Sequence, residues 1–187
     1  KNMINRYLFF ALLMLSTTLV NAQKYFTKTG QAYFISHTDV IDIDGTNNQV
    51  VSFIDFNNGE IACALLVKAF EFTLATAYEH FNETYMESHL YPKSNFKGKI
   101  IDIDKINIEK KGTYDIKVTG DLTIHGVTKN IQVPAKIEVV DKDNITGKCQ
   151  FDVAISDYNI KVPKVVEDRV AKIVNIKLNF NYKPYKN

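Results

Sequence analysis

The chain has 187 residues, with 23 Lys+Arg against 21 Asp+Glu, ten Tyr, twelve Phe and no Trp. Residues 1–22 contain two of the basic residues, Lys1 and Arg6, and no acidic one, so residues 23–187 carry equal numbers of each sign. A neutral domain whose one arginine is Arg169 lacks the positive surface of a nucleic-acid-binding protein. Residues 23–187 are enough for one domain with a core of its own, and no low-complexity linker or internal repeat divides them.

Residues 1–22 predict a secretory signal peptide. Lys1 and Arg6 precede an apolar run over 7–15, and Val20-Asn21-Ala22 supplies the small residues of a cleavage site. The run is shorter than the about 20 apolar residues of a membrane-spanning helix. We therefore expect a mature chain, residues 23–187, that has no membrane span and is periplasmic or secreted. No Cys follows the cleavage site, which argues against a lipoprotein anchor.

The first half of the mature chain predicts three strands and one helix. The strands are expected over 31–36, 49–56 and 60–72, the last of them apolar on both faces in its first part. Over 73–86 the period changes, because Leu74, Tyr78, Phe81 and Tyr85 recur at helical spacing and form one apolar stripe. This pattern predicts a helix of about four turns that ends before Tyr91-Pro92.

The second half alternates apolar and polar residues with period two. Four long strands are predicted, over 114–124, 131–139, 147–155 and 174–182. Turn-forming residues at 57–59, 110–112, 125–126 and 141–144 separate these runs into hairpins. A short helix or loop is expected over 157–168, where Pro163 and clustered charges interrupt the pattern.

Together these elements predict an all-β fold, an antiparallel β-barrel of about eight strands. Strands with one apolar face bury it against a second sheet or by closing on themselves, and about eight strands enclose room for side chains or one small ligand. The inserted helix is expected near the barrel mouth. An immunoglobulin-like sandwich is the alternative, but the buried Trp and the paired inter-sheet cysteines of that fold are missing.

The two cysteines, Cys63 and Cys149, have none of the spacings of zinc or redox motifs. Cys149 shares the apolar face of its strand with Phe151 and Val153. We favour two buried free thiols, because opposite barrel walls hold Cα atoms beyond the ~7 Å limit of a disulfide. An exported chain permits a disulfide, so the pairing stays open.

Catalytic and metal-binding patterns are missing from the sequence. The four histidines have no metal-ligand spacing, and His125 is interpreted as a turn residue whose imidazole bonds nearby backbone. No nucleophile elbow or phosphate-binding loop is present. The carboxylate pairs Asp42/Asp44 and Asp102/Asp104 are interpreted as solvated outer faces of strands. We therefore expect no enzymatic activity, no cofactor and no metal.

Two stretches carry a family resemblance, residues 87–98 (ESHLYPKSNFKG) and 120–129 (GDLTIHGVTK). They resemble, in order and spacing, the motifs of the YceI-like polyisoprenoid-binding family, as do Gly59-Glu60 followed by the Phe-x-Phe of 69–72 and the segment 79–86. Many members carry an Arg-Asp pair in or near this helical segment, where this chain has Glu-His and Glu-Thr, so no head-group role is carried over. The resemblance implies a lipocalin-like barrel that holds an isoprenoid and performs no chemistry on it.

The function expected from residues and resemblance together is that of a non-enzymatic carrier for a long-chain isoprenoid, quinone or fatty amphiphile. The residues expected to line its cavity are Phe34, Phe70, Phe72, Phe81, Tyr85, Phe96, Ile116, Val118, Leu122, Phe151, Val153, Ile176, Leu178 and Phe180. The alternative is a filled barrel that binds a protein partner through its loops. Inward small residues at 98, 120, 135 and 147 are expected to leave room for a ligand. Ligand identity and oligomeric state stay open, a homodimer included.

Overall fold

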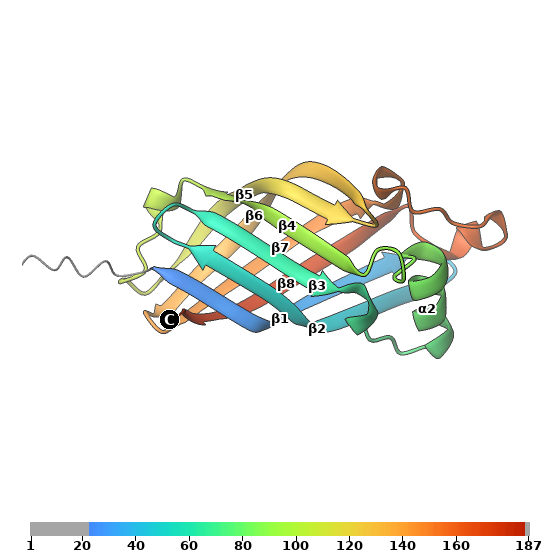
Figure 1. Ribbon diagram of the computed structural model, residues 1–187, viewed down its shortest axis with the longest axis horizontal. Helices are drawn as coiled ribbons and strands as arrows, with labels where there is room; N and C mark the ends of the chain where they lie inside the picture. Colours follow the sequence, from blue (N-terminus) through green and yellow to red (C-terminus); the bar gives the residue numbers. More distant parts are fainter. Residues whose placement is uncertain (1–22, 186–187) are drawn as a thin grey trace, which may run out of the picture.

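The computed structural model describes residues 23–185, which form a closed barrel of eight antiparallel strands and one short helix (Figure 1). Each strand pairs with the next along the chain, and β8 pairs with β1 to close the barrel. The strands are β1 Lys24–His37, β2 Asp42–Asp55, β3 Glu60–Leu66, β4 Lys93–Ile101, β5 Gly112–Ile124, β6 Val127–Asp141, β7 Asn144–Ala154 and β8 Ile173–Pro184. The predicted fold class is thereby confirmed.

The first two strands are longer than the alternation predicted, with 14 residues each. The pairing of β1 with β2 shifts register on both sides of Gly30, and the pairing of β1 with β8 shifts between Phe26 and Gln31. Such bulges add a residue on one strand and reverse which residues face inward. The period-two signal is lost across Gly30, so the prediction found only the second part of β1.

The predicted strand over 60–72 is wrong beyond Leu66. There the chain leaves the barrel wall and forms a 3₁₀ turn, η1 Val67–Ala69, whose Val67 is fully buried. The Val67 N–H donates to the Pro92 carbonyl, and only Glu71 pairs again, with Thr46 of β2. This departure carries Phe70 and Phe72 over the end of the barrel.

The predicted helix over 73–86 is also shorter than its apolar stripe suggested. Helix α2 spans Ala75–His80 and continues as one π turn, η2 Phe81–Tyr85, in which the Met86 N–H donates to the Phe81 carbonyl five residues back. The wider turn splits the stripe. Phe81 and Tyr85 face the barrel interior, whereas Leu74 and Tyr78 are 51% and 39% exposed.

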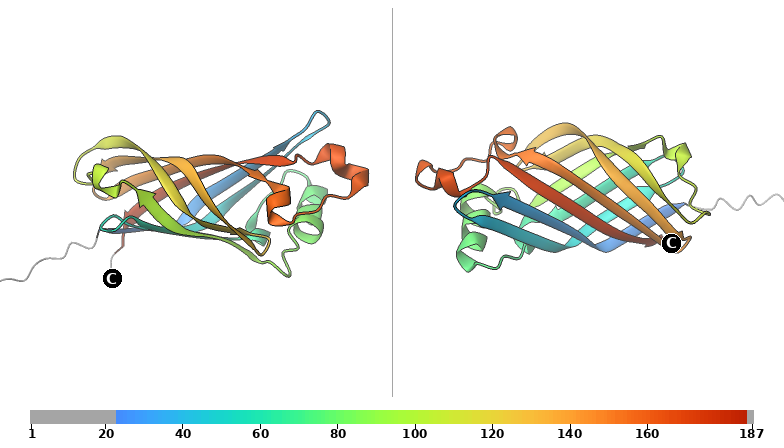
Figure 2. Two further views of the ribbon diagram at one scale, coloured as in Figure 1. Left: turned by 90° about the horizontal axis from the view of Figure 1, so that it is seen from above. Right: turned by 180° about the vertical axis from the view of Figure 1, so that it is seen from behind.

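The connections gather at two ends of the barrel (Figure 2). One end carries the β1–β2 hairpin, α2, and the segment between β7 and β8 with its turns η4 Ile155–Tyr158 and η5 Lys164–Arg169. These turns agree with the helix or loop predicted over 157–168. At the opposite end Asp102 has a φ of 59° and precedes the turn η3 Ile103–Lys105, so the pair Asp102/Asp104 does not lie on a strand face as predicted.

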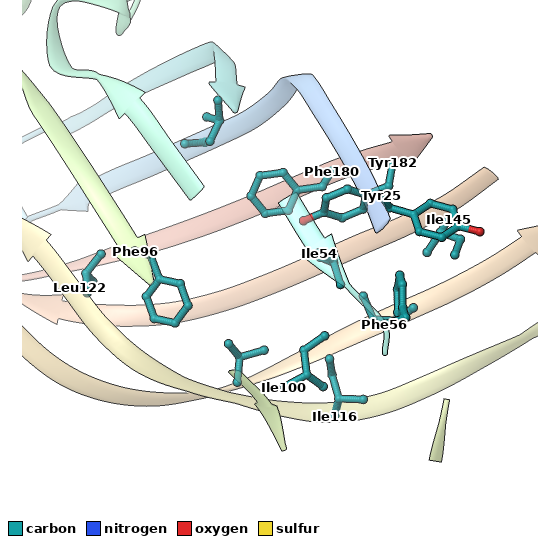
Figure 3. Packing of buried hydrophobic residues seen from close by; sticks show 14 of the residues in the cluster. Tyr25, Ile54, Phe56, Phe96, Ile100, Ile116, Leu122, Ile145, Phe180 and Tyr182 are labelled. Carbon is teal, nitrogen blue, oxygen red and sulfur yellow. The ribbon is translucent and has the colours of Figure 1, made fainter. Parts of the chain in front are cut away.

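The end opposite α2 is filled by a dense apolar core (Figure 3). Its centre contains Tyr25, Ile54, Phe56, Ile145 and Tyr182, all at most 7% exposed. The Ser52 hydroxyl donates to the Ala62 carbonyl, so the Tyr182 hydroxyl donates to Ser52 Oγ at 2.7 Å, and burial raises the pKa of Tyr182. This end of the barrel is closed.

Candidate binding cavity

The barrel half next to α2 encloses an apolar cavity of about 230 Å³, called here the upper cavity. Its walls come from the inward faces of the strands, from the segment after β3, and from α2 and η2. No Asp, Glu, Lys or Arg lines it. Because His80 is both exposed and part of the lining, the cavity reaches the surface beside α2. We call this opening the mouth.

An aromatic cluster forms the roof of the upper cavity. Phe34 of β1 stacks on Phe81 of η2 at 5.4 Å between ring centroids, and Phe70 and Phe72 contact both rings at 5.0–5.8 Å. Each such pair contributes about 0.5–1.5 kcal/mol beyond the area it buries. The cluster therefore attaches the π turn and the segment after β3 to the barrel wall.

A smaller cavity of about 80 Å³, called the lower cavity, lies deeper in the barrel. It is lined by the middle of β5, β6 and β8 and by parts of β2, β3, β4 and β7. Five side chains line both cavities and separate them: Cys63, Phe96, Leu122, Phe151 and Leu178. The interior therefore has two cavities, one above the other, above a packed floor.

All fourteen side chains predicted to line a cavity do line one. Eleven line the upper cavity: Phe34, Phe70, Phe72, Phe81, Tyr85, Phe96, Leu122, Phe151, Val153, Ile176 and Leu178. Ile116, Val118 and Phe180 line the lower cavity only. The structure brings the whole set together, and their contact with a ligand stays a prediction.

Several lining residues were missed by the sequence prediction. Ile43, Ile160 and Val170 reach the upper cavity from the ends of strands or from the segment between β7 and β8, where no alternation marks an inward face. Ala64 and Leu65 lie in the stretch of β3 that is apolar on both sides. That stretch was the available signal, because a strand apolar on both faces is often covered on both.

Two of the four small residues that were expected to leave room for a ligand, Gly98 and Gly120, do not do so, whereas Ala135 and Gly147 line the lower cavity. Gly98 and Gly120 are cross-strand partners, and the Phe96 ring lies over both. A Cβ at Gly120 would lie 2.5 Å from the Gly98 Cα and 2.8 Å from Phe96 Cζ. The space that a missing side chain creates is therefore taken by an aromatic ring and by the neighbouring backbone.

Both cysteines are free thiols whose side chains face the interior. Burial raises the pKa of Cys63 to about 12 and that of Cys149 to about 11. Because the thiolate is the reactive form, these thiols are weak nucleophiles at neutral pH. The favoured interpretation of two free thiols agrees with the structure, and their chemistry is that of small apolar side chains.

The two sequence stretches singled out for their resemblance meet at His125. Its Nε2 lies 2.8 Å from Glu87 Oε2, its Nδ1 lies 3.1 Å from the Tyr158 carbonyl, and the Tyr91 ring contacts the imidazole at 4.5 Å. The prediction that the imidazole bonds nearby backbone is wrong, because its backbone partner is distant in sequence. His125 does lie in the β5–β6 turn, with a φ of 50°. Each joined segment contributes neighbouring lining residues, namely Met86, Ile124 and Ile155. His125 therefore fixes three parts of the cavity wall to one another.

Within residues 23–185 no group of three or more His, Cys, Asp or Glu side chains is placed to hold a metal ion. Over the same residues no helix is long and apolar enough to cross a membrane. The geometry of the cavity is that of a site that takes up apolar groups, and its lining offers few polar atoms to orient a reacting one.

Comparisons with known proteins agree with this arrangement. A family profile described as the YceI-like domain matches residues 22–182. The chain is similar in structure to a polyisoprenoid binding domain from Saccharophagus degradans implicated in plant cell wall breakdown, with a TM-score of 0.72 at 12% identity over 88% of this chain and 99% of that one. It is also similar to BcnA of Burkholderia cenocepacia (TM-score 0.68, 16% identity, 83% and 96% covered) and to a YceI protein of Campylobacter jejuni (0.62, 18%, 81% and 91%). No curated protein sequence matches the chain.

Proposed function

Because the chain belongs to the YceI-like family, we propose that it is a binding protein that holds a long-chain isoprenoid, quinone or similar amphiphile inside its barrel. The observation that carries the proposal is the upper cavity, which has an apolar lining, is lined by no Asp, Glu, Lys or Arg, and reaches the surface beside α2. A similar protein from Saccharophagus degradans is described as a polyisoprenoid binding domain. The proposal extends that class of ligand to this chain.

The energetics of the cavity fit an apolar chain. Each methylene moved from water into such a space contributes about 0.8 kcal/mol. By comparison with a cavity that binds benzene, the volume of the upper cavity suggests a chain of about nine carbons. Such a chain therefore gains about 7 kcal/mol before the costs of association. This gain exceeds the lower estimates of those costs. Binding would rest on the length of the buried chain and little on its chemical detail.

The role is non-enzymatic in this proposal. General acid–base chemistry needs a positioned titratable group at the reacting atom, and no carboxylate lines the upper cavity. The one thiol there, Cys63, is largely protonated because of its raised pKa. His80 lies at the exposed mouth and bonds no second catalytic group among the described residues.

The filled-barrel alternative, an interaction module that binds through its loops, requires a packed interior. Only the half away from α2 is packed in this way, around Tyr25, Phe56 and Tyr182. A cavity of about 230 Å³ in the other half is larger than the isolated voids of ordinary cores. The carrier proposal therefore explains more of the interior.

Export is part of the proposal. Residues 1–22, which lie outside the described part of the chain, would act as a signal peptide, and the mature protein would be periplasmic or secreted. The intact mass of the exported protein tests this, with an N-terminus at or next to Gln23 as the expected result. A membrane-bound protein that retains residues 1–22 would contradict it.

A charge placed in the upper cavity tests the carrier function. Val153 is buried and lines this cavity, whereas Val165 is 87% exposed on η5. Val153→Lys should abolish binding of a fluorescent fatty acid, because an unpaired ammonium is costly in an apolar interior. Val165→Lys is the matched control and should bind as the parent protein does. Absence of uptake by the unmodified protein, for every apolar probe tried, would refute the proposal.

A further inference from the structure

We propose that a constriction inside the barrel limits the length of apolar chain that the barrel interior buries, with Phe96 as its fixed half. The constriction, called here the waist, consists of the five side chains that line both cavities: Cys63, Phe96, Leu122, Phe151 and Leu178. This inference rests on the proposed function, since it concerns which apolar chains enter the upper cavity and how far they reach.

The waist closes the barrel from opposite walls. Cys63, Phe96 and Leu122 lie on neighbouring strands β3, β4 and β5, and each is a Cα partner of the next, so they form one level of the wall. Figure 3 shows two of them, Phe96 and Leu122. Phe151 and Leu178 lie on β7 and β8. In a barrel of eight strands β3 and β7 are four strands apart, as are β4 and β8, and therefore face each other.

Phe96 is the immobilised member of the waist. Its ring lies over Gly98 and Gly120, and a Cβ on either glycine would approach Phe96 Cζ to 2.7 or 2.8 Å. The ring is 7% exposed, whereas Phe151 is only half-buried beside the cavities. The paired glycines form a niche that holds the Phe96 ring in one place, and Phe151 and Leu178 complete the barrier from β7 and β8.

The length of chain that fits on each side of the waist can be estimated from the cavity volumes. A 150 Å³ apolar cavity binds benzene, so by proportion the upper cavity of about 230 Å³ holds about nine carbons, close to two isoprene units. The lower cavity of about 80 Å³ adds about three carbons if the waist opens, and removal of the Phe96 ring adds about six more. Affinity should rise about fourfold per buried carbon until the waist is reached and should then level off.

Prenyl alcohols of one to four isoprene units test the waist by displacement of a fluorescent fatty acid. The unmodified protein should gain affinity strongly from one unit to two, and by no more than about twofold from two units to four. Phe96→Ala should continue to gain, by about tenfold or more, from two units to three, because the chain now reaches the lower cavity. Phe96→Leu should show a smaller gain in the same direction and serves if Phe96→Ala does not fold.

Two variants separate the barrier from a general loosening of the barrel. Phe180→Ala enlarges the lower cavity behind the waist, so it should keep the length limit of the parent protein. Phe26→Ala removes a ring that packs on Tyr185 at 6.2 Å and lines neither cavity, and it should leave the whole affinity profile unchanged.

The outcomes distinguish the two proposals. If the unmodified protein binds no alcohol of any length, the carrier function itself fails. If it binds and its affinity climbs steadily to four units, or if both Phe96 variants keep the parent profile, the carrier function stands and the waist is refuted. A length limit that moves equally in Phe180→Ala would also refute the assignment to Phe96.

Discussion

Replacement of Gly120 by alanine should destabilise the barrel far more than the same replacement at Gly112. A Cβ at Gly120 would lie 2.5 Å from the Gly98 Cα and would overlap the Lys97 carbonyl oxygen, both of them backbone atoms of β4. At Gly112 the nearest atom is the Tyr114 hydroxyl at 3.6 Å, an ordinary contact. Both glycines lie on β5 and neither has a positive φ, so the pair isolates the effect of cross-strand crowding.

The size of the stability loss in Gly120→Ala depends on which atoms can move to relieve the crowding. Overpacked cores cost about 1–3 kcal/mol when side chains can adjust, and here β4 and β5 themselves would have to separate, so we expect about 3 kcal/mol for Gly120→Ala. In a domain of this size that loss lowers the Tm by about 6–12 °C. Gly112→Ala should change the free energy of unfolding by less than about 1 kcal/mol.

Urea denaturation of the two variants, alone and combined with Phe96→Ala, completes the experiment. Because the crowding involves backbone, Phe96→Ala should recover only a minor part of the stability that Gly120→Ala loses. The coupling energy between these two substitutions should therefore stay near the contribution of one ring contact. Near-parental stability of Gly120→Ala would show that the strands can separate at little cost, and the niche under Phe96 would then not be rigid. Full recovery by Phe96→Ala would place the crowding on the ring alone.

Two further predictions concern polar groups of the interior. Burial raises the pKa of Cys63 to about 12 and of Cys149 to about 11, so the folded state keeps protons that the unfolded state loses near pH 9. The free energy of unfolding should therefore fall as the pH rises from about 9 to 12. The double variant Cys63→Ala/Cys149→Ala should reduce that fall, as measured by urea titrations at several pH values. His125→Ala should cost about 2–3 kcal/mol, because it leaves the Glu87 carboxylate and the Tyr158 carbonyl without their partner, whereas His89→Ala at an exposed position should cost less than about 0.5 kcal/mol; equal effects in thermal melts would contradict the role of His125.

The second half of the fold could be predicted from sequence because its strands alternate inward and outward residues without a break over the predicted ranges, and the one register shift where these strands pair with one another, between Val139 and Asp141, lies at the end of β6. From Tyr114 to Ile124 and from Val174 to Tyr182 each alternate residue faces inward, so the cavity-lining positions on β5 and β8 follow directly. The register shifts beside Gly30 break the alternation of inward and outward residues on β1, and no local residue pattern indicates where the alternation starts again.

The features that the sequence did not reveal depend on approaches between distant segments. The π turn after His80 redirects Phe81 and Tyr85 although the stripe itself is regular. Gly98 and Gly120 appear as empty space in a linear sequence, and only their pairing across β4 and β5 shows that a ring covers them. Likewise, nothing near His125 indicates that its imidazole bonds the carbonyl of Tyr158, 33 residues away.

The ends of the described chain lie together, away from the cavity mouth. Tyr185 donates its N–H to the Lys24 carbonyl at 2.7 Å, and both lie at the end of the barrel opposite α2 (Figure 1). A few added residues could join β8 to β1, and the turn at 141–144, at the same end, offers a place to reopen the chain as a circular permutant. A fusion partner or a solid support attached at either end would likewise leave the mouth facing outward and free to exchange its contents.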